Sequence, residues 1–149
     1  MLKPILLVED NPKDLELTLM AFTKIRLANE VISLRDGAEA LDYLYCQGQY
    51  EGRHEGHPTV VLLDLKLPKV DGLEVLAKMK GDPDLQLVPV VMLTSSREEQ
   101  DLMRSYQLGV NAYVVKPLDF TEFITAVQEL GVFWTVLNEQ PLGSQKQKR

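Results

Sequence analysis

The chain has 149 residues, of which 45% are hydrophobic and 26% are charged, a composition typical of a globular protein with one domain. Its 22 acidic residues outnumber its 16 basic residues and give a net charge of −6, so it lacks the basic surface typical of nucleic-acid-binding proteins. No signal peptide and no apolar run of roughly 18 residues is present, and Cys46 is the only cysteine. We therefore expect a soluble, cytoplasmic protein with one domain over residues 1–140 and a flexible tail over 141–149 that contacts neither DNA nor membrane.

Five short apolar runs predict the strands of a single sheet. Four of them are apolar almost throughout, which is typical of strands buried on both faces of a parallel sheet. The second run alternates between apolar and polar residues and therefore indicates a strand at an edge. The runs lie at 5–8, 31–34, 60–63, 90–93 and 112–115.

Stretches of helical periodicity separate these strands, and turn residues mark where the helices begin. The first helix is predicted from Asn11 and Pro12, an N-cap residue followed by proline at the first helical position. A fourth helix is expected over 97–108 and is closed by Gly109. The other helices are expected after Asp36-Gly37, after Asp71-Gly72, and from Phe120 through Trp134.

This alternation predicts an α/β fold with five βα units in one domain. Right-handed crossovers with helices on both faces favour a doubly wound, five-stranded parallel sheet in the flavodoxin-like order 2-1-3-4-5. The polar, glycine-rich segment 46–58 is expected to form a long loop or an extension of the second helix.

Polar side chains follow four of the predicted strands. In open parallel sheets, ligand sites lie beyond the carboxyl ends of the strands, where the strand order reverses. We therefore expect these residues to converge on one edge, although each motif alone is more often a solvated turn or a helix cap. They are Glu9, Asp10, Asp64, Thr94 and Lys116.

The residue types at this edge indicate a metal site. Three carboxylates close together either hold protons or bind a cation, and all-oxygen ligation with water favours Mg²⁺. We expect Asp10 and Asp64 to coordinate directly, Glu9 to act through water, and the backbone carbonyl of Lys66 to supply a further oxygen.

The same residues also suit phosphoryl transfer. A carboxylate beside a metal can attack phosphorus and form an aspartyl phosphate, while an ammonium and a hydroxyl neutralise the phosphoryl oxygens. Asp64, Lys116 and Thr94 fit these three roles.

The motifs that carry these residues resemble the receiver domains of two-component response regulators. The resemblance covers residues 3 to about 138 and is carried by ILLVEDN at 5–11, LLDLKLPKVDG at 62–72, VVMLTSS at 90–96 and GVNAYVVKP at 109–117. It implies that the phosphohistidine of a sensor histidine kinase donates to Asp64, with Mg²⁺ as the cofactor. The protein would then be a phosphoacceptor for signalling and not a turnover enzyme.

The resemblance also implies roles for further residues. Tyr113 matches the aromatic residue that moves inward when the Thr94 hydroxyl is drawn to the phosphoryl group. Lys66 and Ser96 occupy positions that influence how water reaches the aspartyl phosphate and hence its lifetime. A cis peptide bond is implied before Pro117.

A narrower resemblance is to stand-alone regulators that partner phytochromes. It is carried by the lengthened segment before the third strand, KGDPDLQLVPVV at 80–91, SYQLGVNAY at 105–113, and Phe133-Trp134. It implies a phytochrome kinase as donor and a homodimer formed through the carboxyl-terminal half. Trp134 fits an anchor in that dimer and packing within its own domain about equally well.

Three alternative functions are considered. An aspartate-nucleophile phosphatase needs an acid two residues after the nucleophile, where Lys66 stands. A flavin module needs a phosphate-binding loop after the first strand, where Glu9 and Asp10 would repel phosphate. A degenerate receiver would act only as a docking module.

His54 and His57 are expected to be solvated loop residues.

Overall fold

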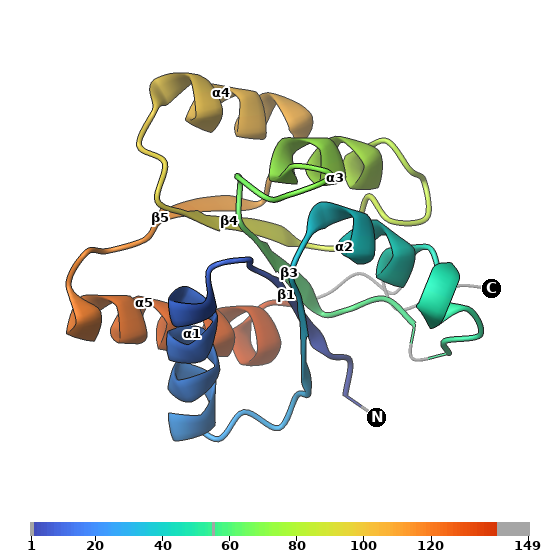
Figure 1. Ribbon diagram of the computed structural model, residues 1–149. Coiled ribbons are helices and arrows are strands. Elements are labelled where there is room, and N and C mark those ends of the chain that lie inside the picture. The colour runs from blue at the N-terminus through green and yellow to red at the C-terminus, as the bar shows by residue number, and fades with distance from the viewer. Residues whose placement is uncertain (1, 55, 140–149) are drawn as a thin grey trace.

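The computed structural model describes residues 2–54 and 56–139, which form one parallel sheet with helices on both sides (Figure 1). The strand order is β2-β1-β3-β4-β5, so the predicted fold class and the position of β2 at an edge are confirmed. The fourth strand is one residue longer than predicted because it includes Thr94. The strands are β1 (Ile5–Val8), β2 (Val31–Leu34), β3 (Val60–Leu63), β4 (Val90–Thr94) and β5 (Ala112–Val115).

Two layers of helices sandwich the sheet (Figure 1). Helices α1 and α5 cover one face, and α2, α3 and α4 lie on the other. Their bounds are α1 (Pro12–Lys24), α2 (Gly37–Leu44), α3 (Gly72–Lys80), α4 (Glu99–Leu108) and α5 (Phe120–Val132).

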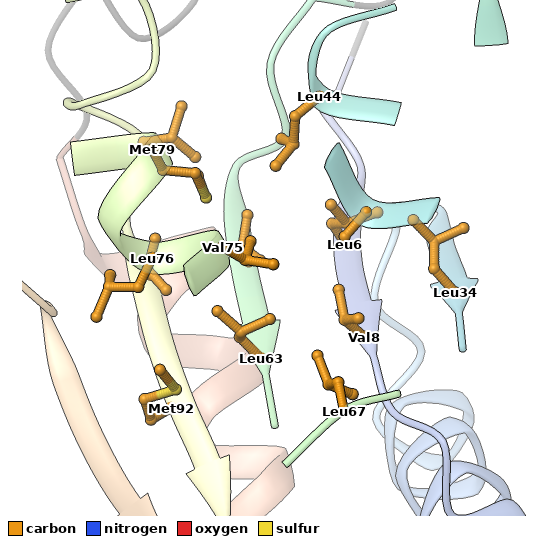
Figure 2. Packing of buried hydrophobic residues seen from close by; sticks show 14 of the residues in the cluster. Leu6, Val8, Leu34, Leu44, Leu63, Leu67, Val75, Leu76, Met79 and Met92 are labelled. Atoms are coloured by element: carbon orange, nitrogen blue, oxygen red, sulfur yellow. The ribbon is translucent and has the colours of Figure 1, made fainter. Parts of the chain in front are cut away.

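The central strand β1 shows why both layers are needed. Successive side chains of a strand point to opposite faces. Leu6 and Val8 accordingly belong to the core beneath α2 and α3, whereas Ile5 and Leu7 belong to the core beneath α1 and α5. Figure 2 shows the first core, in which residues of α3 pack over the sheet, among them Val75, Leu76 and Met79. Because both faces are covered by helices, the polar residues that follow the strands gather at the end of the sheet.

Of the five α-helices in the described part of the chain, four have side-chain N-caps and α4 does not. Asn11, Asp36, Asp71 and Asp119 each accept a backbone N–H of the first turn. Glu98 precedes α4 without such a hydrogen bond, and its backbone is extended. The helix therefore begins two residues later than its predicted start at residue 97. Its end is as predicted, because Gly109 closes it with a φ of 101°.

The end of the last helix differs from the prediction. Helix α5 stops at Val132, and a π-helical turn, η2 (Phe133–Leu137), carries Trp134. Trp134 is only 9% exposed and belongs to the core shared by α1 and α5, which supports packing within its own domain. Phe133, edge-on to Trp134 with ring centroids 4.9 Å apart, is 46% exposed.

The segment between α2 and β3 folds back on α2 instead of extending it. A short 3-10 turn, η1 (Gly48–Tyr50), is followed by Arg53, whose guanidinium lies 3.9 Å from the centre of the Tyr43 ring. Arg53 also donates to the backbone carbonyls of Tyr43, at 3.1 and 2.8 Å, and of Gly56, at 2.7 Å. This fold-back buries His57 completely, so the prediction of a solvated His57 is wrong.

His57 and His54 have different surroundings in this segment. Nε2 of His57 lies 3.7 Å from Oδ2 of Asp84. His54 is exposed, as predicted.

Two further expectations concern membrane spans and the end of the domain. Among the described residues, every helix is too short or too polar to cross a membrane. The predicted tail at 141–149 lies outside the described residues, so the domain boundary at residue 140 stays a prediction.

Candidate functional site

The polar residues that follow β1, β3, β4 and β5 meet at one end of the sheet. They surround an open cleft of about 480 Å³. The cleft is lined by Asp10, Asn11, Pro12, Asp14, Asp64, Lys66, Ser95, Ser96, Glu98 and Lys116. The convergence expected from the sequence is therefore present, and Glu9 and Thr94 lie buried within the same region.

Asp64 is fixed at the end of β3 by the backbone around it. Its own N–H donates to the carbonyl of Val8 on β1 at 3.1 Å. The following loop returns so closely that the N–H of Gly72 donates to the carbonyl of Leu65 at 2.7 Å. A Cβ at Gly72 would lie 2.2 Å from the carbonyl oxygen of Asp64, so only glycine allows this approach. The Asp71-Gly72 pair thus starts α3 and positions Asp64.

Lys116 joins three carboxylates, one on helix α1 and two in the loops that follow β1 and β3. Its Nζ lies 2.7 Å from Oε1 of Glu9, 2.9 Å from Oδ2 of Asp14 and 3.1 Å from Oδ2 of Asp64. The lysine side chain is only 6% exposed, so these ion pairs are shielded from water. Charge-assisted hydrogen bonds of this kind are about twice as strong as neutral ones.

Burial and charge oppose each other at Glu9 and Lys116. Burial raises the pKa of Glu9 to about 7, although the Lys116 ammonium lowers it and the Asp64 carboxylate raises it further. Burial lowers the pKa of Lys116, but its hydrogen bonds to Glu9 and Asp14 and the charge of Asp64 outweigh this, so its pKa is raised. Lys116 is therefore firmly protonated, while Glu9 can exchange its proton for another cation near neutral pH.

The carboxylates suit a divalent cation. One oxygen from each of Glu9, Asp10 and Asp64 can be chosen so that all three lie within 4.8 Å of one another. With Asp14, the site holds four carboxylates, of which three pair with the single ammonium of Lys116, so the cluster carries excess negative charge when ionised. An all-carboxylate donor set at a cleft open to water is the environment that Mg²⁺ prefers. The side chain of Lys66 is exposed at the cleft wall, and the role of its carbonyl stays a prediction.

Thr94, Ser96 and Tyr113 are linked through the loop after β4. Oγ1 of the buried Thr94 accepts the Ser96 N–H at 3.2 Å. The Tyr113 hydroxyl donates to the Ser96 carbonyl at 3.2 Å, with the ring partly buried against the core of α2 and α3. Burial raises the pKa of Tyr113, so its hydroxyl remains a donor. In this structure the Tyr113 ring is therefore held against the loop after β4 by its hydroxyl.

The predicted cis bond before Pro117 is wrong for this structure. All peptide bonds among the described residues are trans, including that between Lys116 and Pro117. The trans form of an X-Pro bond is favoured by about 0.5–1 kcal/mol, and with it Lys116 still reaches all three carboxylates.

Two residues at the site were missed by sequence reasoning. Asp14 binds Lys116 from the first turn of α1, and Asp101 accepts the Ser96 hydroxyl from the first turn of α4. An acidic residue in a first helical turn is expected anyway, because it complements the helix dipole. Their only sequence signal was therefore one that most helices show.

Comparisons with known proteins agree with this geometry. Residues 5–128 match the response regulator receiver domain family. The response regulator Rcp1 of Synechocystis sp. is 44% identical over 132 residues, which are 89% of this chain and 88% of Rcp1. A structure of Rcp1 in its Mn²⁺-bound form has a TM-score of 0.87 and 42% identity, covering 93% of this chain and 99% of that chain.

Two further solved structures come from regulators named for phytochromes. The bacteriophytochrome response regulator AtBRR is 68% identical, with a TM-score of 0.75, covering 93% of this chain and 99% of AtBRR. The phosphorylated cyanobacterial phytochrome response regulator RcpA is 40% identical, with a TM-score of 0.89, covering 95% of this chain and 99% of RcpA.

Proposed function

Because the chain belongs to the family of response regulator receiver domains, we propose that it accepts a phosphoryl group on Asp64 from the phosphohistidine of a sensor histidine kinase. It is a receiver-domain response regulator related to phytochrome response regulators, within two-component signalling. The observation that carries the proposal is the shielded cluster in which Lys116 Nζ lies 3.1 Å from Oδ2 of Asp64, beside an open cleft.

The transfer uses groups that the cleft already holds. A carboxylate oxygen of Asp64 attacks phosphorus, the phosphorus–nitrogen bond to the kinase histidine breaks, and that nitrogen keeps the electron pair. The Lys116 ammonium, which pairs with carboxylates in this structure, would then also pair with the phosphoryl oxygens. The Thr94 hydroxyl, whose oxygen accepts the Ser96 N–H, keeps its own proton to donate to a phosphoryl oxygen.

The cofactor of the proposed reaction is Mg²⁺. It would be held by Glu9, Asp10, Asp64 and the backbone carbonyl of Lys66, where it would supply positive charge to the phosphoryl oxygens. The carboxylate cluster supports this choice, and so does the Mn²⁺ present in the Rcp1 structure.

Residues of the same site would respond to the aspartyl phosphate and set its lifetime. Thr94 and Tyr113 would form the switch, because both are joined to the backbone of Ser96. Lys66 and Ser96 line the cleft and would govern the access of water to the aspartyl phosphate. One phosphoryl group held per molecule makes the protein a signalling phosphoacceptor and not a turnover enzyme.

The proposed donor is a phytochrome kinase in the cytoplasm. The likeness to AtBRR, at 68% identity, and to RcpA supports this choice, since both are named as phytochrome regulators. The downstream partner would be reached by protein contacts.

A homodimer through the carboxyl-terminal half is also proposed. An apolar groove of about 530 Å³ supports it, lined by residues of β5, α5 and η2, including Val114, Leu130 and Phe133. Val136 and Leu137, which follow in the same π-helical turn as Phe133, are 68% and 67% exposed.

Phosphotransfer tests the proposal directly. The protein and its Asp64→Asn variant are incubated with autophosphorylated histidine kinases, phytochromes among them, with and without Mg²⁺. We expect Mg²⁺-dependent, hydroxylamine-sensitive label on the wild type alone, fastest from a phytochrome. Asp71→Asn is the matched control, because asparagine caps α3 as well as aspartate does.

Other results would favour the alternatives. Label retained by Asp64→Asn would refute the acceptor assignment. No transfer from any kinase or from acetyl phosphate would favour the docking module, and sustained release of phosphate from phosphomonoesters would favour the phosphatase.

A further inference from the structure

Four hydrogen bonds meet at Ser96: one is local, from the Glu98 N–H to the Ser96 hydroxyl oxygen at 3.3 Å, and the other three join different parts of the molecule. Its hydroxyl donates to Oδ2 of Asp101 in the first turn of α4, at 2.5 Å. Its N–H donates to Oγ1 of Thr94, at 3.2 Å. Its carbonyl accepts the hydroxyl of Tyr113 on β5, at 3.2 Å. The position of this one residue therefore affects Thr94, Tyr113 and α4 together.

Helix α4 buries few of its side chains. Ser105 is the one buried residue of this helix, every residue of which the structure describes. Met103 and Tyr106 are 52% and 54% exposed, and the helix lies beside α3 at the rim of the fold (Figure 1). Because α4 also lacks a side-chain N-cap, the hydrogen bond between Asp101 and Ser96 makes a large contribution to fixing its first turn.

We propose that Asp101 is a positioning residue for the phosphoryl transfer, because it holds Ser96 where its N–H orients the Thr94 hydroxyl and its carbonyl receives Tyr113. This inference rests on the proposed function and deepens it, since it names how α4 is coupled to the reacting site. Asp101 itself touches neither Asp64 nor the phosphoryl group; it acts through Ser96.

The direction of the hydrogen bonds gives the mechanism. A serine hydroxyl has one proton, and here that proton goes to a carboxylate, which makes a charge-assisted bond. The Thr94 oxygen is occupied as an acceptor, so its own proton is free for a phosphoryl oxygen. If the phosphoryl group draws the Thr94 hydroxyl toward Asp64, Ser96 follows because its N–H is bound to Thr94. Asp101 and the first turn of α4 then move with the Ser96 hydroxyl.

The first test measures phosphorylation by phosphoramidate, a small donor that needs no kinase contacts. Asp101→Ala should slow phosphorylation about five- to tenfold, because the Thr94 hydroxyl is no longer held in place. Asp101→Asn keeps an acceptor oxygen and should fall between this variant and the wild type. Ser96→Ala should slow the reaction as Asp101→Ala does, and the double variant should be no slower than either.

The matched control is Glu99→Gln, which removes the same charge from the same exposed turn. It should leave the rate within a factor of about two. A control as slow as Asp101→Ala would mean that the charge of α4 matters and not the bond to Ser96. Additive effects of Ser96→Ala and Asp101→Ala would also overturn the proposal.

The second test needs no phosphoryl donor. Fluorotyrosine is incorporated at the 5 tyrosines, and the fluorine resonance of Tyr113 is assigned with Tyr113→Phe. Asp101→Ala should shift or broaden the Tyr113 resonance, and Glu99→Gln should leave it unchanged. An unmoved Tyr113 resonance in Asp101→Ala overturns the positioning role even if Asp64 accepts phosphate. A moved resonance supports the role even if Asp64 does not.

Discussion

Two lysines at opposite ends of the sheet are held in similar ways and have opposite properties. Lys116 follows β5 and donates to three carboxylates, whereas Lys80 ends α3 and donates to three neutral oxygens. The acceptors of Lys80, each at 3.0 Å, are the carbonyls of Gln86 and Val88 and Oδ1 of Asn111. The number and length of the hydrogen bonds are therefore nearly equal at the two ends.

The charge of the acceptors makes the difference. Burial alone lowers the pKa of Lys80, because neutral oxygens only partly replace the water that the ammonium loses. At Lys116 the same effect of burial is outweighed by the carboxylates, and the pKa is raised. The neutral end fixes the start of β4 and β5, since Asn111 also accepts the Val90 N–H at 2.8 Å. The charged end keeps an excess of carboxylates for cations and phosphoryl transfer.

Removing each ammonium in turn should separate the two roles. Lys116→Met should slow phosphorylation by phosphoramidate about 100-fold, because a charge that stabilises the transferring group is lost. Lys80→Met should leave that rate within a factor of about two and lower the free energy of unfolding by about 1 kcal/mol, because three acceptors, of which only the Val88 carbonyl belongs to a buried residue, lose their donor. Single-turnover kinetics and urea unfolding measure the two effects.

The variants also serve as controls for each other. A Lys80→Met protein that folds but phosphorylates as slowly as Lys116→Met would mean that the two ends are not independent. Lys116→Met should stay folded, since the buried Glu9 can take up a proton when its partner is removed.

The pKa of Glu9 predicts how pH acts on the charged end. A folded-state pKa of about 7, above the usual value of 4.5, means that Glu9 holds a proton at pH 6 and that a metal must displace it. Mg²⁺ should therefore bind about tenfold more tightly at pH 8 than at pH 6, with release of a proton at the lower pH. Calorimetry in buffers of different ionisation enthalpy measures both quantities.

The raised pKa of Glu9 also predicts how pH changes the stability of the folded protein. Because the pKa of Glu9 is raised in the folded state, the stability that Glu9 contributes is present below pH 4.5 and is lost as the pH rises through about 7. The metal-free protein should thus lose stability between pH 5 and 8, and Glu9→Gln should flatten both this curve and the pH dependence of Mg²⁺ binding. Mg²⁺ affinity that is unchanged across this range would contradict the proposed role of Glu9.

The framework of the sheet could be predicted because its determinants are local. Apolar runs fixed the strands, and Asn11, Asp36 and Asp71 marked helix starts that the structure confirms. The start of α4 was predicted two residues too early, because Glu98 remains extended and periodicity does not reveal the hydrogen bond that ties Ser96 to Asp101.

The candidate site was predictable where its residues follow strands, since the topology then places them together. Glu9, Asp64 and Lys116 are of this kind. Asp14 lies on α1 and Lys80 lies on α3, and the direction of a helical side chain depends on how its helix is packed. The burial of His57 likewise follows from the fold-back of the segment anchored by Arg53, which periodicity does not reveal.

The substitution with the smallest expected effect gives Lys80 a charged acceptor, as Lys116 already has. Asn111→Asp is isosteric, and its carboxylate can still accept both the Val90 N–H and the Lys80 ammonium. It should raise the pKa of Lys80, where burial now lowers it, and stabilise the protein near pH 7 by no more than about 1 kcal/mol, because Asn111 is exposed. The Lys80 ammonium can be followed by NMR titration, with phosphorylation unchanged. If the pKa of Lys80 stayed low in Asn111→Asp, the charge of the acceptors would not explain the difference between the two lysines.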